Sequence, residues 1–244
     1  MTTLKVPTGV KRLDSLLGGG IPAGSAVMVY GPPFLGKETL ARRYVLASLG
    51  AGLPAVYVLT NAATDEVRAD LLAADPGYKR AEDEHRARFV DTYSRGIGAA
   101  DSFKDATYLD GALDLNGISL AVNKAQAAIM GKHEAHALVV DSVSTLIAYS
   151  SAQTAFRFLQ TLIGRTRRVG ATGLYLMDQG MHTDADVQMF KHLMTGTIEL
   201  RESSGKTQVQ VQGLGATAAP GWVDYRFDEK VFEITGSFAA GRIR

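Results

Sequence analysis

Short apolar runs that alternate with helical stretches constrain the fold of this chain more than any other feature of its sequence. Five runs share a high content of Val, Leu and Tyr: 26–30 ("AVMVY"), 55–59 ("AVYVL"), 88–93 ("RFVDTY"), 137–141 ("ALVVD") and 172–177 ("TGLYLM"). Runs so short and apolar predict strands buried on both faces, which is typical of a parallel sheet. The stretches between them place apolar residues at helical spacing, as at Leu40 and Tyr44 or at Leu159 and Ile163. The sequence therefore predicts an α/β fold with helices on both faces of a mostly parallel central sheet, and any ligand at the carboxyl ends of the strands.

The last quarter of the chain has a different pattern. Polar and apolar residues alternate in "GTIELRE" (196–202), "TQVQVQG" (207–213) and "KVFEIT" (230–235). Alternation predicts strands with one solvated face, so we expect antiparallel strands or hairpins at the edge of the sheet. Two other segments are less determined. Residues 75–86 are highly charged, which suits a solvated helix or loop, and residues 96–117 have no sustained period, which suits a mobile insertion.

Length and composition restrict the possible functions. The 244 residues fall within the range of one large α/β domain, and no linker or repeat divides them, so we expect a single domain over 1–244. The absence of cysteine excludes disulfides, thiolate metal sites and cysteine nucleophiles. The 26 basic and 25 acidic residues nearly cancel, so no global field draws the chain to nucleic acid. Without an apolar signal core or an uninterrupted run of 18 apolar residues, we expect a cytoplasmic protein that does not insert into membranes.

The segment after the first apolar run nearly matches the phosphate-binding pattern GxxxxGK(S/T). A strand, a glycine loop and a helix from about Lys37 form the context in which this pattern marks a site. Gly31 and Gly36 permit close approach of the backbone, and the amides at the helix start point toward phosphate oxygens. We expect Lys37 to reach the β and γ phosphates, whereas Pro32 and Pro33 provide no amide donors. The predicted nucleotide-binding residues of this loop are Gly31, Pro32, Pro33, Phe34, Leu35, Gly36, Lys37, Glu38 and Thr39.

Glu38 stands where the pattern has a hydroxyl that binds Mg²⁺. A carboxylate there adds negative charge beside a polyanionic substrate. It can bind the metal itself, serve only as a favourable charge at the helix start, or repel the γ phosphate and favour a diphosphate or an empty site. Thr39 cannot replace the hydroxyl, because one helical residue turns the side chain by about 100°. Mg²⁺ binding is therefore left open.

Two other strand ends have polar residues that fit a nucleotide site. Asp141 ends "HALVVD", the position at which a carboxylate meets the Mg²⁺ above a phosphate loop, so we predict a metal-associated role for it. Its alternative role is that of a turn residue or helix cap. Gln179 follows "GLYLMD", where a side-chain amide can sense a γ phosphate, although an ordinary polar loop entry explains the pattern equally well.

These motifs, preceded by "TGVKRLDSLLGGGIPAGS" (8–25), resemble those of the RecA superfamily of P-loop ATPases, in particular the single-domain KaiC-like branch that includes archaellum ATPases of the FlaH type. The resemblance covers residues 8–234, and "FVDTYS" and "HLMTGTIELRE" are also similar to that branch. It implies a RecA-like P-loop fold with ATP or ADP as ligand. It also implies a ring or filament in which the nucleotide lies between neighbouring subunits.

The resemblance also assigns roles to single residues. Gly31, Gly36 and Lys37 match the phosphate loop of the family. Asp141 matches its metal-associated aspartate, and Gln179 matches the glutamine that follows the strand of the fourth motif.

Other positions depart from the family's pattern. KaiC-like enzymes have a glutamate pair that activates water after the second strand, but Asn61 and Ala62 stand there in this chain, and neither accepts a proton at neutral pH. Asp65 and Glu66 come later and are expected at the start of the next helix, as charges that stabilise it or as a displaced base. The family's late Lys and Arg, which reach the neighbour's γ phosphate, are missing, because residues 210–221 include no basic residue. A general base alone contributes about 10²- to 10⁴-fold to a rate, so we expect weak or no hydrolysis.

A histidine pair and a set of arginines also have residue types that occur in binding sites. His133 and His136 form an HxxH pair without a third ligand at a suitable spacing, so we expect surface loop histidines rather than a metal site. The helix before Gly170 is basic through Arg157, Arg165, Arg167 and Arg168. This pattern fits a solvated face best, and a nucleic-acid or acidic partner less well. After Gln179, the stretch that contacts DNA in RecA relatives has Lys191 as its only permanent cation, so we expect no nucleic-acid partner.

The leading expectation is a KaiC-like regulatory or assembly protein that binds ATP or ADP and hydrolyses it weakly or not at all. Binding would bias a homo-oligomer, or a hetero-oligomer with another RecA-like or regulatory protein. The first alternative is an active ATPase of the same fold, with Glu38 or Asp65 in catalysis. The second is a structural partner that binds no nucleotide and completes a ring with an active relative.

Overall fold

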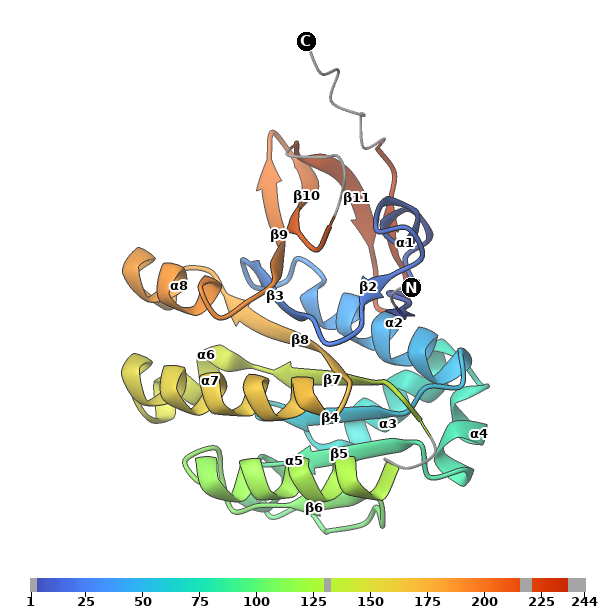
Figure 1. Cartoon of the computed structure of the whole chain (residues 1–244), viewed down its shortest axis with the longest axis vertical. Coiled ribbons are helices and arrows are strands. Elements are labelled where there is room, and N and C mark those ends of the chain that lie inside the picture. Colours follow the sequence, from blue (N-terminus) through green and yellow to red (C-terminus); the bar gives the residue numbers. More distant parts are fainter. Residues whose placement is uncertain (1–3, 130–132, 216–220, 237–244) are drawn as a thin grey trace.

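A ten-stranded sheet with helices on both faces dominates the structure, a computed structural model that describes residues 4–129, 133–215 and 221–236 (Figure 1). The strands are β1 (Lys5–Val6), β2 (Ile21–Pro22), β3 (Ala26–Gly31), β4 (Ala55–Leu59), β5 (Ala87–Asp91), β6 (Ala106–Tyr108), β7 (His136–Asp141), β8 (Ala171–Asp178), β9 (Gly196–Ser203), β10 (Lys206–Gly213), β11 (Val223–Phe227) and β12 (Phe232–Ile234). The helices are α1 (Lys11–Leu16), α2 (Lys37–Gly50), α3 (Thr64–Ala74), α4 (Tyr78–Asp83), α5 (Leu115–Ile129), α6 (Val143–Tyr149), α7 (Ala152–Arg168) and α8 (Asp184–Lys191), with a 3-10 turn η1 at Ser94–Ile97. Strands β1 and β2 form a separate antiparallel pair.

The strand order of the large sheet is β12-β11-β10-β9-β3-β8-β7-β4-β5-β6. All pairings from β9 to β6 are parallel, and those from β9 to β12 are antiparallel. The predicted fold, a mostly parallel sheet with C-terminal antiparallel strands, is confirmed. Strand β9 is the junction, because it pairs in parallel with β3 and antiparallel with β10. The parallel arrangement brings the carboxyl ends of β3, β8, β7 and β4 to one edge, where a ligand site is expected.

Alternate residues of each central strand enter two separate cores. In β4, Tyr57 and Leu59 pack in the core that contains α1 to α4, whereas Val56 and Val58 pack in the core that contains α5 to α8. All four side chains are at most 3% exposed. Because both faces of the strand are buried, every position in the run must be apolar, which explains the pattern in the sequence.

The two undetermined segments contain regular structure. Residues 75–86 include helix α4, which buries Tyr78 and Ala81 against the rest of the chain. Residues 96–117 include β6, which has only three residues and pairs with β5. A strand of three residues is too short for a periodic signal, so the sheet edge could not be found from sequence. Strand β11 was missed as well, and residues 216–220 before it lie outside the described residues.

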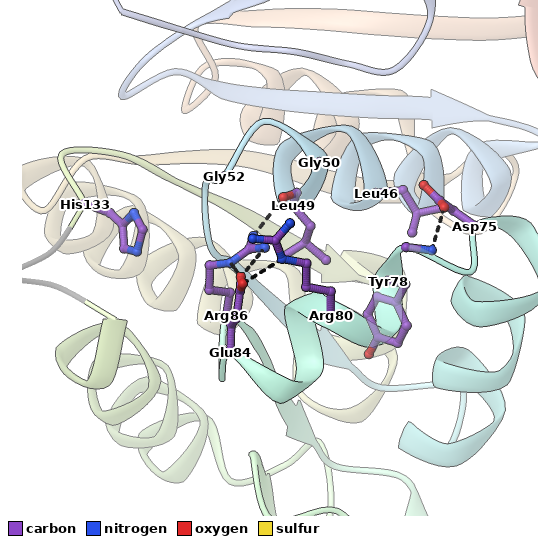
Figure 2. Close-up of a pocket in the computed structure, with 11 residues that line it drawn as sticks. Leu46, Leu49, Gly50, Gly52, Asp75, Tyr78, Arg80, Glu84, Arg86 and His133 are labelled. Carbon is purple, nitrogen blue, oxygen red and sulfur yellow. Dashed lines mark hydrogen bonds and ion pairs between the residues drawn. The ribbon is translucent and has the colours of Figure 1, made fainter.

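A cavity of about 510 Å³ lies at the amino end of the strands, between the end of α2 and helix α4 (Figure 2). Its charged groups already have partners, because Arg80 and Arg86 each bind Glu84 at 2.8 Å and Arg86 also donates to the carbonyl of Leu49 at 2.7 Å. His133 lies at the side of this cavity. The cavity therefore has a neutralised rather than a charged lining.

The second histidine of the HxxH pair is not on a surface loop. His136 is 2% exposed in β7, and its Nε2 lies 2.9 Å from the amide nitrogen of Gln126. That expectation was wrong for His136, because the strand begins one residue earlier than the apolar run suggested. Among the described residues no group of three His, Cys, Asp or Glu side chains is arranged to hold a metal ion. None of the described helices has the length and apolar character that crossing a bilayer requires.

Candidate nucleotide site at the carboxyl edge

The predicted phosphate loop connects the end of β3 to the start of α2. Gly31 ends the strand, and Lys37 is the first residue of the helix. Gly36 has a φ of 82°, a left-handed conformation that glycine adopts without strain. Phe34 also has a positive φ, 64°, and its side chain is 91% exposed. The nine residues predicted from the motif thus lie together, as a strand–loop–helix unit.

Lys37 is held inside the site. Its Nζ lies 2.8 Å from Oδ1 of Asp178 and donates to the carbonyl of Pro32 at 2.8 Å, and the side chain is 1% exposed. Asp178 is the last residue of β8, the strand beside β3. A phosphate that reaches Lys37 must therefore compete with Asp178 for the ammonium group. The sequence placed Asp178 at a strand end, but only the strand order shows that it is the partner of Lys37.

Carboxylates accumulate around this lysine. Asp141 ends β7, and burial, followed by the nearby charges of Glu38 and Asp178, raises the pKa of Asp141 to about 7. The predicted metal-associated Asp141 and the unusual Glu38 are thus close enough to influence one another. With no complete set of protein ligands among the described residues, a Mg²⁺ ion here would need phosphate oxygens as further ligands, which is how this ion commonly binds.

Strand β11 and the turn after it pack against the phosphate loop. The Tyr225 hydroxyl donates to the carbonyl of Leu35 at 2.7 Å, and the Thr39 hydroxyl donates to the carbonyl of Asp228 at 2.9 Å. A Cβ on Gly36 would lie 2.6 Å from the ring of Phe227, so only glycine fits there. These contacts join positions that are 189 and 190 residues apart in the chain. Nothing in the sequence pattern indicated that this strand supports the loop.

The position of the family's glutamate pair is occupied by a neutral hydrogen-bonded cluster. Asn61 is exposed, its Nδ2 donates to the Ser142 hydroxyl at 3.4 Å, and its Oδ1 accepts from the Thr145 hydroxyl. Thr60 connects the same two strand ends, because its hydroxyl donates to the carbonyl of Asp141 at 2.9 Å. Ala62 has no polar side chain. No carboxylate belongs to this cluster.

Asp65 and Glu66 lie in the first turn of α3, as expected. Asp65 accepts hydrogen bonds from Ser102 at 2.6 Å and from Arg68 at 3.1 Å. Each of the two oxygens of this carboxylate is thus already occupied by a donor. The geometry gives a displaced-base role no support.

Gln179 directly follows β8, and its backbone N–H donates to the carbonyl of Gly31 at 2.9 Å. The residue is exposed at the edge next to the phosphate loop. His182 lies nearby: its Nε2 is 2.9 Å from the Ser144 hydroxyl, which also accepts from the N–H of Asp178 at 2.9 Å. Burial lowers the pKa of His182. Sequence reasoning missed His182, although its place three residues after Gln179 was a signal.

The comparisons with known proteins agree with this architecture. Residues 24–200 match a family described as a family of unknown function, DUF7504. The chain is 28% identical over 185 residues to a UPF0273 protein of Methanopyrus kandleri, which covers 75% of this chain and 70% of that protein. It is 28% identical to a UPF0273 protein of Pyrococcus furiosus, of which it spans 61%. It is also 46% identical over 55 residues to the DNA repair and recombination protein RadB of Halobacterium salinarum, covering 22% of this chain and 23% of RadB.

A solved structure resembles nearly the whole chain. The crystal structure of a KaiC-like protein from Pyrococcus horikoshii superposes with a TM-score of 0.74 at 16% identity and covers 95% of this chain and 99% of that one. The predicted RecA-like fold of the KaiC branch is thereby confirmed. The chain therefore belongs to the DUF7504 family and has the fold of the KaiC-like protein.

Proposed function

We propose that this protein binds ATP in its phosphate loop and uses the bound state, rather than fast hydrolysis, to bias its assembly or its interaction with a partner. One contrast supports the proposal most. Lys37 and the start of α2 have the arrangement of a phosphate cradle, whereas the strand ends where water would be activated have Asn61 and Ala62. Different residues at this edge would therefore bind the nucleotide and activate the water, so binding can persist without hydrolysis.

The residues of the cradle have defined tasks in the proposed complex. The free amides at the start of α2 and the positive end of its dipole bind phosphate oxygens. Lys37 leaves Asp178 and contacts the terminal phosphates. Mg²⁺ would neutralise phosphate charge, and Asp141 and Glu38 are the residues that would hold it.

The residues opposite the cradle limit hydrolysis. The Asn61 amide can orient a water molecule but cannot take a proton from it. Its oxygen already accepts from Thr145, and Asp65 is held by Arg68 and Ser102. A missing general base lowers the rate by about 10²- to 10⁴-fold.

A specific observation also favours a second candidate, a structural partner that binds no nucleotide. The loop groups that would meet phosphate already have protein partners, Lys37 with Asp178 and Thr39 with Asp228. Such a loop is stable when empty. In that case the chain would complete an assembly with an active relative.

Titration calorimetry with ATP and Mg²⁺ tests the proposal. We expect heat of binding from the unmodified chain and from Lys79→Ala, a matched change of a lysine that is 58% exposed on α4, and none from Lys37→Ala. Absence of heat from folded, unmodified protein would favour the structural partner. Phosphate release provides the second arm: rapid turnover that Lys37→Ala abolishes would establish an active ATPase instead.

A further inference from the structure

The two helical faces of the sheet differ in how their surface charges are paired. On the face of α2 to α4, Arg42 binds Asp70 at 2.6 Å and Arg68 binds Glu82 at 2.6 Å. Lys79 binds Asp83 at 3.0 Å. These three basic side chains thus have acidic partners from their own or a neighbouring helix.

The opposite face, formed by α5 and α7, has cations without acidic partners. Neither helix contains Asp or Glu. Their exposed basic residues are Lys124, Arg157, Arg165, Arg167 and Arg168. None of these five forms an ion pair with any residue in the described ranges. In a chain with a formal net charge of only +1, this is a local concentration of positive charge.

A groove lies between these two helices, which run side by side on the near face of the sheet in Figure 1. Its volume is about 470 Å³. Arg157 and Arg165 of α7 line it, and Arg165 donates to the Ser119 hydroxyl of α5 at 3.3 Å. Asp114 is the only carboxylate of the lining, and it accepts the N–H of Gly117 at 2.8 Å. The groove therefore offers guanidinium groups whose charge no carboxylate neutralises.

Apolar side chains accompany these cations. Leu113 lines the groove and is 65% exposed, and Leu120 of α5 is 70% exposed. Phe158 of α7 also lines the groove. Exposed apolar side chains gain free energy when a partner covers them. The two most exposed ones are aliphatic and Phe158 is half-buried, so nucleic-acid bases have little to stack on. Cations combined with aliphatic side chains favour an acidic protein segment over a phosphate backbone.

We propose that the groove between α5 and α7, here called the α5/α7 groove, binds an acidic amphipathic segment of a partner protein. Carboxylates of the segment pair with Arg157 and Arg165, and its apolar residues cover Leu113 and Phe158. The two arginines are eight positions apart on one helix, which corresponds to about 12 Å. A helical partner with carboxylates separated by two turns matches this distance. Arginine is suited to this task because it binds carboxylates through two parallel hydrogen bonds.

The α5/α7 groove lies on a helical face and shares no residue with the phosphate loop. The inference therefore goes beyond nucleotide binding and does not depend on it. All measurements below are made without nucleotide, so a failure of the docking surface is not confused with a failure of the nucleotide site.

Selection from a displayed peptide library against the full chain tests the inference. We expect the recovered peptides to combine acidic residues, two helical turns apart, with leucine-like residues between them. Fluorescence anisotropy should then show that a recovered peptide binds Arg157→Glu/Arg165→Glu at least about tenfold more weakly than it binds the unmodified chain. Binding should persist in the matched reversal Lys79→Glu/Arg80→Glu on the other face and should weaken several-fold in Leu113→Ser.

Three outcomes would overturn the inference. The first is a library that yields no acidic peptides. The second is a peptide whose affinity is the same for both charge reversals, or is unchanged when its residue order is scrambled. The third is tighter binding of single-stranded or duplex DNA that is lost in Arg157→Glu/Arg165→Glu, which would assign the groove to nucleic acid.

Discussion

Strand β7 has a titratable residue at each end, and the charges that surround these two residues differ. At the amino end, His136 is 2% exposed, and burial lowers its pKa to about 4. The amide nitrogen of Gln126 can only donate, so Nε2 of His136 accepts this hydrogen bond and the ring is neutral. At the carboxyl end, burial and the charges of Glu38 and Asp178 raise the pKa of Asp141 to about 7. Burial favours the neutral form of both residues, but only at the carboxyl end do neighbouring like charges add to the shift.

The same difference extends across the two edges of the sheet. At the amino edge, Arg80 and Arg86 meet the carboxylate of Glu84 beside the cavity of Figure 2. At the carboxyl edge, Lys37 is bound to Asp178, and further carboxylates stand close to the pair. A balanced set of charges stabilises the fold without a ligand. An unbalanced set is relieved when a metal ion or another cation binds, as expected of a site.

Adding a base to the carboxyl edge is the change with the largest expected effect. In Asn61→Glu a carboxylate replaces the amide where the family's first glutamate stands, so phosphate release should rise about 10²-fold. Malachite-green detection of phosphate measures it. Asn61→Gln is the control, since it keeps an amide of similar length. Equal rates for the two variants would contradict the prediction that a missing proton acceptor limits hydrolysis at this edge.

Lowering the pH should decrease the free energy of unfolding through His136, at the amino end of β7. Between pH 6.5 and about 4 the unfolded chain binds a proton that the folded chain excludes, so stability falls as the pH falls through this window. From pH 7 to pH 5 this residue should remove about 2 kcal/mol of unfolding free energy. Urea denaturation at the two pH values should show that His136→Gln loses correspondingly less unfolding free energy than the unmodified chain. His133→Gln, beside the cavity, should keep the full loss, and an identical pH response of both variants would refute the assignment.

Removing one hydroxyl should loosen the phosphate loop. Tyr225→Phe keeps the ring that stacks on Phe232 at 4.6 Å but leaves the Leu35 carbonyl without its donor. The expected loss is about 1 kcal/mol of unfolding free energy, with faster hydrogen exchange of the loop amides. Tyr149→Phe, on a side chain that is 57% exposed, is the matched control. Unchanged exchange over residues 31–39 would show that β11 does not support the loop.

The smallest expected effect concerns the repulsion between the carboxylates of Glu38 and Asp141. Glu38→Gln removes the carboxylate whose charge raises the pKa of Asp141 more than the charge of Asp178 does, so that pKa should fall toward its usual value. Carboxyl-carbon NMR titration measures it. Arg88→Gln, a change of one charge at the amino edge, should leave it in place. An unchanged Asp141 pKa in Glu38→Gln would show that burial and Asp178 account for the shift without Glu38.

Much of the fold was predictable because its signals are local. The five apolar runs are buried on both faces, and such a strand can be recognised from its own residues without knowledge of its neighbours in the sheet. Strand β6 and helix α4 were not predictable, because a three-residue strand and a charged six-residue helix have no clear period. His136 was misjudged because it is a polar residue that becomes buried only through its partner Gln126, ten positions away.

The strand–loop–helix unit around Lys37 could be inferred from local signals, since the glycines, the lysine and the flanking periodicities lie within one short segment. That Asp178 binds Lys37 and that Tyr225 supports Leu35 became known only from the folded chain. Tyr225 and Leu35 are 190 positions apart, and they meet because of the order of strands in the sheet, which no local pattern encodes.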